Sequence, residues 1–256
     1  MPNPHDLVKQ QFGAHAQAYT TSAVHARGDS LARLVELTHP ARAWRVLDVS
    51  TGAGHTALMF APHVTEVIAT DLTPEMLDAG RSLATARQIT NVQFTPADAE
   101  TLPFGNDGFD LVTNRIALHH YRDAQTAVRE MARVCKAGGL VALVDNITPP
   151  VAEVGAYING FETLRDPSHH WAHPLDDLQA FFVAAGLRVE HTETLKKKME
   201  FDPWVARLGA PADVRAEVRR LLVEAPTGAR QFLAPVTENG LLHFTLEEAI
   251  IISRKR

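Results

Sequence analysis

Five short runs rich in apolar and β-branched residues, separated by stretches of helical pattern, constrain the fold of this chain more than any other feature. The runs are Val46–Val49, Glu66–Thr70, Val92–Thr95, Phe109–Thr113 and Leu140–Val144. Strands that alternate with helices need crossover connections, and these produce a parallel sheet covered by helices. The sequence therefore predicts an α/β fold. Within it, an apolar stripe predicts a helix over Ala124–Lys136, with Cys135 on its buried face.

The alternation stops at Pro149-Pro150, and the chain that follows has another pattern. Apolar residues three or four apart predict a helix, which ends in a loop at Arg165–Trp171; these residues are Val151, Val154, Ile158, Phe161 and Leu164. We then expect a helix at 175–186, a strand at 187–192, a helix around 204–224 and a last strand at 249–253. A single domain results, with an N-terminal cover (1–40), a core (41–147), an inserted segment (148–186) and a C-terminal part (187–256).

Composition excludes several classes of protein. The 256 residues are 45% apolar and 21% charged, as in an ordinary globular domain. The single cysteine, Cys135, cannot form an internal disulfide, and the net charge of −5 argues against a nucleic-acid partner. Neither a spanning segment of about 20 apolar residues nor a signal peptide is evident, so we expect a cytoplasmic protein without a membrane span.

The most informative motif is a strand, a glycine turn and a helix start at Val46–Ala57. Glycines at 52 and 54 let the backbone approach a ligand closely, and the helix behind them offers free N–H groups. The same glycines also fit a dinucleotide fingerprint. The glycines alone therefore leave two classes of cofactor open.

Three carboxylates favour one of these classes. Asp71 ends the second predicted strand, where a carboxylate can accept both hydroxyls of a ribose. Asp98 follows the third strand, where it could meet an adenine amino group, and Asp48 lies beside the glycine turn. Carboxylates attract a ligand that bears an ammonium and a sulfonium and repel a pyrophosphate, so the pattern favours S-adenosylmethionine over a nicotinamide dinucleotide.

With these motifs in order, the sequence resembles the class I S-adenosylmethionine-dependent methyltransferases, and within them the small-molecule branch that includes the ubiquinone and menaquinone C-methyltransferases. The resemblance covers roughly residues 40–147 and rests on Val46–Gly54, Asp71–Leu77, Asp98–Phe104, Phe109–Val112, Leu118–His120 and Cys135–Gly139. It implies a Rossmann-like, mostly parallel sheet of seven strands with helices on both faces and an antiparallel last strand. It also implies a helical N-terminal cover, which Phe12, Tyr19 and His25 resemble, and a helical insertion after the fifth strand.

The resemblance also implies which residues hold the cofactor and its product, S-adenosylhomocysteine. Thr51, Gly52 and Gly54 would wrap the methionyl half, with Asp48 close by, and Asp71 would hold the ribose. The adenine would meet Leu72, Met76, Asp98 and Ala99, while Asn114 and the cover residue Tyr19 would line the pocket. The chain departs from the family at Ser50, where a glycine is usual, which implies either a tolerable φ or a slightly opened turn.

Histidines supply the candidates for catalysis. His119 and His120 follow the fourth strand at the edge where open α/β sheets bind ligands, and either could act as a general base; each could also cap a turn or pack in the core. The predicted acceptor site draws on the same edge and on the insertion, with Arg115, Asp145, Phe161, Arg165, His169, His170 and Trp171. Packing alone explains Phe161 equally well. We predict no metal site, because the histidines of the insertion lie in a loop without a recognisable ligand pattern.

Other functions fit less well. A short-chain dehydrogenase needs a Tyr-x-x-x-Lys pair, which is absent: the residues four after Tyr19, Tyr121 and Tyr157 are Ala23, Gln125 and Phe161. Cytosine C5 methylation needs a nucleophilic cysteine, and Cys135 is expected in the core. A cofactor-binding regulator without transfer activity stays open, as does a homodimer. The favoured function is methyl transfer to a small-molecule acceptor by in-line displacement.

Overall fold

A computed structural model describes residues 4–21 and 28–256, without the side chains of residues 4 and 17–21. The predictions for the Tyr19 side chain and for His25 therefore fall outside the described residues. The helices, including two short 3-10 turns (η), are α1 (Pro4–Thr21), α3 (Asp29–Thr38), α4 (His55–Phe60), η1 (Ala61–His63), α5 (Pro74–Ala86), η2 (Leu118–His120), α6 (Ala124–Val134), α7 (Ala152–Arg165), α8 (Leu175–Ala184), α9 (Phe201–Ala206), α10 (Ala212–Val223) and α11 (Thr227–Leu233). The strands are β1 (Arg45–Val49), β2 (Glu66–Asp71), β3 (Val92–Pro96), β4 (Phe109–Arg115), β5 (Cys135–Ile147), β6 (Leu187–Glu200), β7 (Val236–Glu238) and β8 (Leu241–Lys255).

The described strands form one sheet in the order β3-β2-β1-β4-β5-β8-β6, and β7 pairs with β8 as an eighth strand. The five strands β1 to β5 are parallel to one another, whereas β8 runs antiparallel to β5, β6 and β7. The predicted α/β fold with an antiparallel last strand is confirmed. Its strand order reverses at β1, between β2 and β4, and open sheets of this kind bind ligands beside that reversal.

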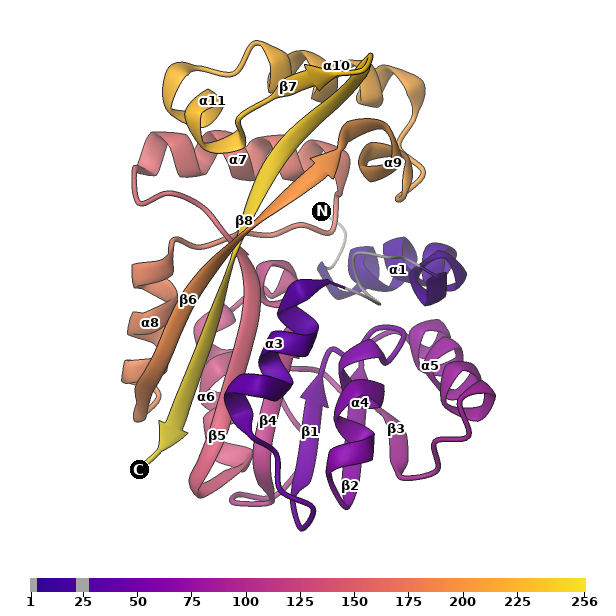
Figure 1. Cartoon of the computed structure of the whole chain (residues 1–256), viewed down its shortest axis with the longest axis vertical. Coiled ribbons are helices and arrows are strands. Elements are labelled where there is room, and N and C mark those ends of the chain that lie inside the picture. Colours follow the sequence, from indigo (N-terminus) through magenta and orange to yellow (C-terminus); the bar gives the residue numbers. More distant parts are fainter. Residues whose placement is uncertain (1–3, 22–27) are drawn as a thin grey trace.

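Apolar strand residues give the sheet two buried faces. On one face α3 and α4 pack through Leu34, Ala57 and Phe60, and on the other α6 and α8 pack through Val128, Met131 and Phe182. The continuous burial of β1, β2 and β4 is typical of parallel strands covered on both sides. In Figure 1, α1 lies across the upper ends of the first strands, so it covers their carboxyl edge.

The long strands β6 and β8 extend past the parallel core and carry a second lobe of α7, α9, α10, α11 and β7 (Figure 1). This lobe has its own apolar cluster, in which the rings of Phe161 and Trp204 stack at 5.3 Å and that of Phe244 packs edge-on at 4.8 Å from Trp204.

Several predicted boundaries were wrong. The helix expected at 204–224 is two helices, α9 and α10, because Gly209 turns the chain at φ +69° and Pro211 precedes α10. The helix expected at Ala124–Lys136 ends at Val134, and Cys135 begins β5, although Cys135 is fully buried as predicted. The strands expected at 187–192 and 249–253 are parts of the longer β6 and β8.

Alanine substitutions at two helical glycines should have opposite effects on stability. A Cβ on Gly80 in α5 would lie 2.4 Å from Cε1 of Phe94, whereas one on Gly160 in α7 would meet nothing within 4 Å. We expect Gly160→Ala to raise the free energy of unfolding by about 0.5–1 kcal/mol through lower chain entropy. Gly80→Ala should lower it by about 1–3 kcal/mol through overpacking. Urea denaturation of both variants checks this, and equal effects at the two sites would contradict the packing of α5 on β3.

Candidate active site

A cavity lies at the carboxyl ends of β1, β2 and β4, under α1, where the strand order reverses. Its empty volume is about 920 Å³, including its opening to solvent, which is within the range for small-molecule sites. The lining residues are His5, Val8, Phe12, Ser50, Thr51, Gly52, Ala53, His55, Thr56, Asp71, Leu72, Met76, Asp98, Ala99, Glu100, Arg115, Ile116, Ala117, His120 and Tyr121. We call it the donor cavity.

The glycine turn forms one wall of the donor cavity. Ser50, Gly52 and Gly54 all have positive φ, at +54°, +55° and +82°. The left-handed conformation is unfavourable for a serine. Here the Ser50 Oγ lies 2.7 Å from the hydroxyl of Tyr121, which also accepts a hydrogen bond from Asn114 Nδ2 at 2.6 Å. Ser50 thus adopts the left-handed conformation in place of the usual glycine, and its side chain is held by Tyr121, which Asn114 fixes in turn.

Asp48 holds this turn from behind. Its Oδ2 accepts hydrogen bonds from Thr51 Oγ1 at 2.5 Å and from the backbone N–H of Ala57 at 3.1 Å, and its Oδ1 accepts one from Thr113 Oγ1 at 2.7 Å. Burial raises the pKa of its carboxyl to about 6, against these hydrogen bonds. Asp48 is 1% exposed and is not among the described residues that line the cavity. The structure thus places Asp48 behind the turn, where it positions Thr51, and its role toward the cofactor stays a prediction.

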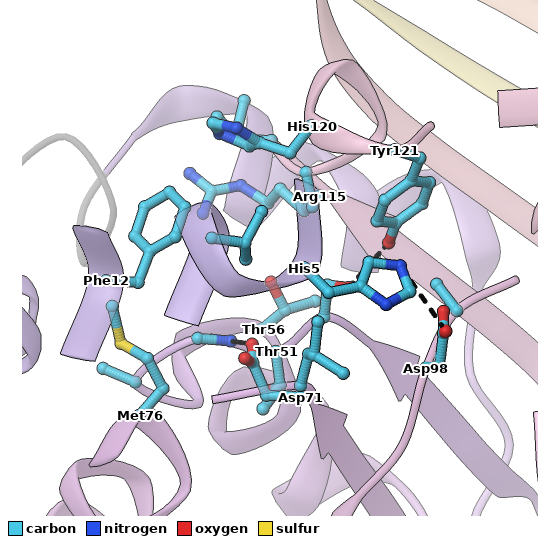
Figure 2. Close-up of a pocket in the computed structure, with 18 of the residues that line it drawn as sticks. His5, Phe12, Thr51, Thr56, Asp71, Met76, Asp98, Arg115, His120 and Tyr121 are labelled. Carbon is cyan, nitrogen blue, oxygen red and sulfur yellow. Dashed lines mark hydrogen bonds and ion pairs between the residues drawn. The ribbon is translucent and has the colours of Figure 1, made fainter. Parts of the chain in front are cut away.

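Asp71 lies on the floor of the cavity (Figure 2). Its Oδ2 accepts a hydrogen bond from the Gly52 N–H at 2.8 Å, and its Oδ1 accepts one from the Thr73 N–H at 2.9 Å. Burial raises the pKa of the Asp71 carboxyl, whereas these two donors favour its charged form. Because a carboxylate oxygen can accept more than one hydrogen bond, both oxygens retain capacity for a ligand.

The predicted adenine residues lie together around Asp71. Leu72, Met76, Asp98 and Ala99 all line the cavity, and Figure 2 shows Met76 and Asp98 on opposite sides of it. Asp98 Oδ2 lies 3.6 Å from Nε2 of His5 on α1. Gly54 and Asn114 do not line the cavity in the described chain, where Gly54 ends the turn before α4 and Asn114 holds Tyr121 and the Val49 carbonyl.

A second cavity adjoins the first and shares Phe12, Ile116 and His120 with it. We call it the acceptor cavity, after the acceptor site that the sequence predicts at this edge. Its walls come from η2, α7, α9 and the long strands β6 and β8, and its other lining residues are His119, Asn146, Glu162, Arg165, Asp166, His169, Lys197, Met199, Trp204, Arg207 and Leu246. Its empty volume is about 590 Å³, including space open to solvent.

The two predicted catalytic histidines have different partners. His119 Nδ1 lies 2.5 Å from Asp145 Oδ1, and burial opposes its charge, but the Asp145 carboxylate outweighs burial and raises the pKa of His119. His120 Nδ1 lies 3.0 Å from the backbone carbonyl of Ser168. Burial, together with the neighbouring His119, lowers the pKa of His120 to about 4. His120 is therefore the neutral histidine of the pair, and it is the one that borders both cavities.

The predicted acceptor residues do not all lie at one site. Arg165 and His169 line the acceptor cavity, while Arg115 lines the donor cavity and Asp145 lies behind His119. Phe161 is 1% exposed and packs on Trp204 in the core of the second lobe, so packing explains it. His170 and Trp171 are exposed and line neither cavity, because their backbone N–H groups bond the His119 carbonyl and their side chains face outward.

Sequence reasoning missed several lining residues. His5, Val8 and Thr56 lie on α1 and in the first turn of α4, and Lys197 and Arg207 come from β6 and the end of α9. Thr56 could have been predicted from the sequence, because it lies in the first turn of the helix that follows the glycine turn. Among the described residues no cluster of three or more His, Cys, Asp or Glu is arranged for a metal ion. No helix in ranges 4–21 and 28–256 is long and apolar enough to cross a bilayer.

A carboxylate-lined cavity at the strand reversal of a Rossmann-like sheet is typical of the class I methyltransferases, and comparisons with known proteins agree. Residues 47–143 match the family model described as a methyltransferase domain. The chain is 37% identical over 247 residues to the uncharacterized methyltransferase YcgJ of Bacillus subtilis, covering 96% of this chain and 98% of that protein. The chain belongs to this family and is an S-adenosylmethionine-dependent methyltransferase.

A solved structure of YcgJ and one further relative support this assignment. The crystal structure of the YcgJ protein from Bacillus subtilis has a TM-score of 0.85 and 36% identity, covering 89% of this chain and 98% of that chain. The ubiquinone/menaquinone biosynthesis C-methyltransferase UbiE of Idiomarina loihiensis is 33% identical over 166 residues, or 62% of this chain and 65% of that protein. The family resemblance predicted from the motifs is confirmed, and it favours a methyltransferase over both an oxidoreductase and a regulator without activity.

Proposed function

We propose that this enzyme binds S-adenosylmethionine in the donor cavity and methylates a small molecule held in the acceptor cavity, by in-line displacement. The observation that carries the proposal is that the two cavities meet at Phe12, Ile116 and His120. A methyl group delivered at this junction reaches an acceptor without crossing solvent. A cytoplasmic location, no nucleic-acid partner and an open choice between monomer and homodimer stay predictions from the sequence.

The residues of the donor cavity fit this cofactor. Asp71 would accept hydrogen bonds from the ribose hydroxyls, and Leu72 and Met76 would cover the adenine beside Asp98. Thr51 and Gly52 would surround the methionyl half, and the Arg115 guanidinium would attract its carboxylate. The carboxylates of Asp71, Asp98 and Glu100 make a poor site for a pyrophosphate. When bound, the cofactor supplies an electrophilic methyl group on a positively charged sulfur.

His120 is suited to remove a proton from the acceptor. Since the Ser168 carbonyl can only accept a hydrogen bond, the adjacent Nδ1 of His120 carries the proton, and Nε2 keeps its lone pair. His119 is fixed by Asp145 and lies against His120, with 4.2 Å between ring centroids. We infer that His120 Nε2 is the base and that His119 positions it.

The experiment that tests the function measures S-adenosylhomocysteine formation with quinols, phenols, amines and thiols as acceptors. We expect methyl transfer to at least one small-molecule class. Binding of S-adenosylmethionine without product from any of them would contradict the proposed small-molecule activity.

The pKa of His120 predicts the acid limb of the rate profile. His120 acts as a base only when neutral, and its pKa of about 4 keeps it neutral well below the usual histidine value of about 6.5. With an acceptor that does not itself titrate, we expect the single-turnover rate to stay flat from about pH 7.5 down to about pH 5. A tenfold fall per pH unit starting near 6.5 would contradict a depressed pKa.

A further inference from the structure

We propose that the methyl acceptor carries a carboxylate, which Arg165 and Lys197 bind within the acceptor cavity. This inference rests on the proposed function and adds the chemical class of the acceptor. Both cations line the acceptor cavity and not the donor cavity, whereas His120 borders both. An acceptor that spans them would present its nucleophilic atom at His120 and its acidic group to the two cations.

The Arg165 guanidinium is fixed and retains a donor. Its Nε donates to the Trp204 carbonyl at 3.3 Å, its Nη1 donates to Glu162 Oε2 at 3.3 Å, and its Cζ lies 4.2 Å from the centroid of the Trp204 ring. The contacts found in the described chain thus engage Nε and Nη1, which leaves Nη2 to donate to a ligand. The Arg165 side chain is 9% exposed, so its position is set before a ligand arrives.

Lys197 is fixed in the same way. Its Nζ lies 2.9 Å from Glu248 Oε2 and donates to Asn146 Oδ1 at 3.0 Å, which leaves one N–H of the ammonium for a ligand. The Lys197 side chain is 18% exposed, whereas that of its neighbour Lys196 is 76% exposed. Alternation along β6 therefore turns Lys197 toward the acceptor cavity and Lys196 away from it.

More cationic groups than carboxylates line the acceptor cavity, which favours an anion over a cation. Arg165, Lys197, Arg207 and His119, whose pKa is raised, line it together with the carboxylates of Glu162 and Asp166. The carboxylates that pair with His119 and Lys197 lie behind the cavity wall. They are Asp145, which is 1% exposed, and Glu248, which is 2% exposed. Asp166 Oδ1 is already engaged by the N–H and the hydroxyl of Ser168. A ligand in the cavity thus meets more positive than negative groups.

The same wall argues against an acceptor with a long alkyl tail. Met199, Trp204 and Leu246 give the cavity an apolar part that suits the body of a small ring compound. A polyprenyl chain in this cavity would displace water from Arg165, Lys197 and Glu162 without replacing its hydrogen bonds, which is costly. The distant similarity to quinone C-methyltransferases therefore does not extend to the expected acceptor.

The test measures binding of matched acids and amides to the enzyme saturated with S-adenosylhomocysteine. The probes are 4-hydroxybenzoate, 4-aminobenzoate and indole-3-acetate, each beside its primary carboxamide, with menadiol as a neutral quinol, in isothermal titration calorimetry. We expect at least one acid to bind about tenfold or more tightly than its amide and than menadiol. Lys197→Gln should reduce this preference to about threefold or less, and Lys197→Arg should retain most of it.

Lys196→Gln is the matched control, because it removes the same charge one residue away on the outer face of β6 and should leave the preference unchanged. Thermal denaturation of each variant shows whether it is folded. Acids that bind no better than their amides, or tighter binding of menadiol, would overturn the carboxylate proposal while leaving the methyltransferase assignment intact. Failure of S-adenosylhomocysteine to bind would instead count against the proposed function.

Discussion

Asp71→Ala is expected to weaken S-adenosylmethionine binding by at least about tenfold, and by up to about a thousandfold if two charge-assisted hydrogen bonds to the ribose are lost. The variant also removes the acceptor for the N–H groups of Gly52 and Thr73, so the glycine turn loses its anchor. Isothermal titration calorimetry measures the dissociation constant directly. Asp71→Asn should weaken binding as well, because an amide nitrogen cannot accept a hydrogen bond from either N–H.

Asp78→Ala supplies the control for Asp71. Asp78 lies on α5 beside the site, its side chain is 73% exposed, and it pairs with Arg81, so its loss should leave cofactor affinity within about twofold. Thermal denaturation without ligand separates a binding defect from unfolding. Unchanged affinity in folded Asp71→Ala would remove Asp71 from the ribose role.

His120→Asn should lower the rate of methyl transfer by about a hundredfold to ten-thousandfold, which is the usual contribution of a general base. Asparagine can still donate to the Ser168 carbonyl, which His120 Nδ1 contacts at 3.0 Å, but it has no nitrogen lone pair that can take a proton. Affinity for the cofactor should change by less than about fivefold, because the substitution leaves Asp71 and the glycine turn in place. Single-turnover assays with saturating cofactor measure the chemical step.

The control for His120 is His170→Asn. His170 is an exposed histidine in the loop after α7, and it lines neither cavity. Its turnover should match that of the wild type. Equal turnover of His120→Asn and the wild type, with an acceptor that must lose a proton, would show that no base acts at this position.

The cofactor half of the molecule could be predicted because its signals are local. The buried strand before the glycine turn, the acid that ends β2 and the residues after β3 are each fixed within a few positions of sequence, and the parallel sheet brings their ends together. The orientation of Asp48 could not be predicted from the sequence, for a physical reason. A carboxylate beside a turn can face the ligand or hold the turn, and only the positions of Thr51, Thr113 and Ala57 show that it holds the turn.

The acceptor half could not be predicted because it is assembled from distant residues. Lys197 lies in a run of three lysines, which is more typical of solvated surface, and only its pairing with Glu248 across β6 and β8 shows that its side chain is half-buried. Likewise, the helix pattern at 204–224 contains Gly209 and Pro211, which separate α9 from α10 and place Trp204 under Arg165. Loop residues such as His169 and Trp171 gave no periodic signal that could tell an inward from an outward side chain.

A comparison of binding between two classes of cofactor tests the central claim most directly. In isothermal titration calorimetry on the wild-type protein, S-adenosylmethionine and S-adenosylhomocysteine should bind with dissociation constants in the micromolar range, because Asp71 and Asp98 can accept hydrogen bonds from the ribose and adenine that both compounds carry. The acidic groups also attract the sulfonium of S-adenosylmethionine. Neither NAD⁺ nor NADP⁺ should give measurable heat. Tight uptake of a nicotinamide dinucleotide, with no binding of either sulfur compound, would contradict the account.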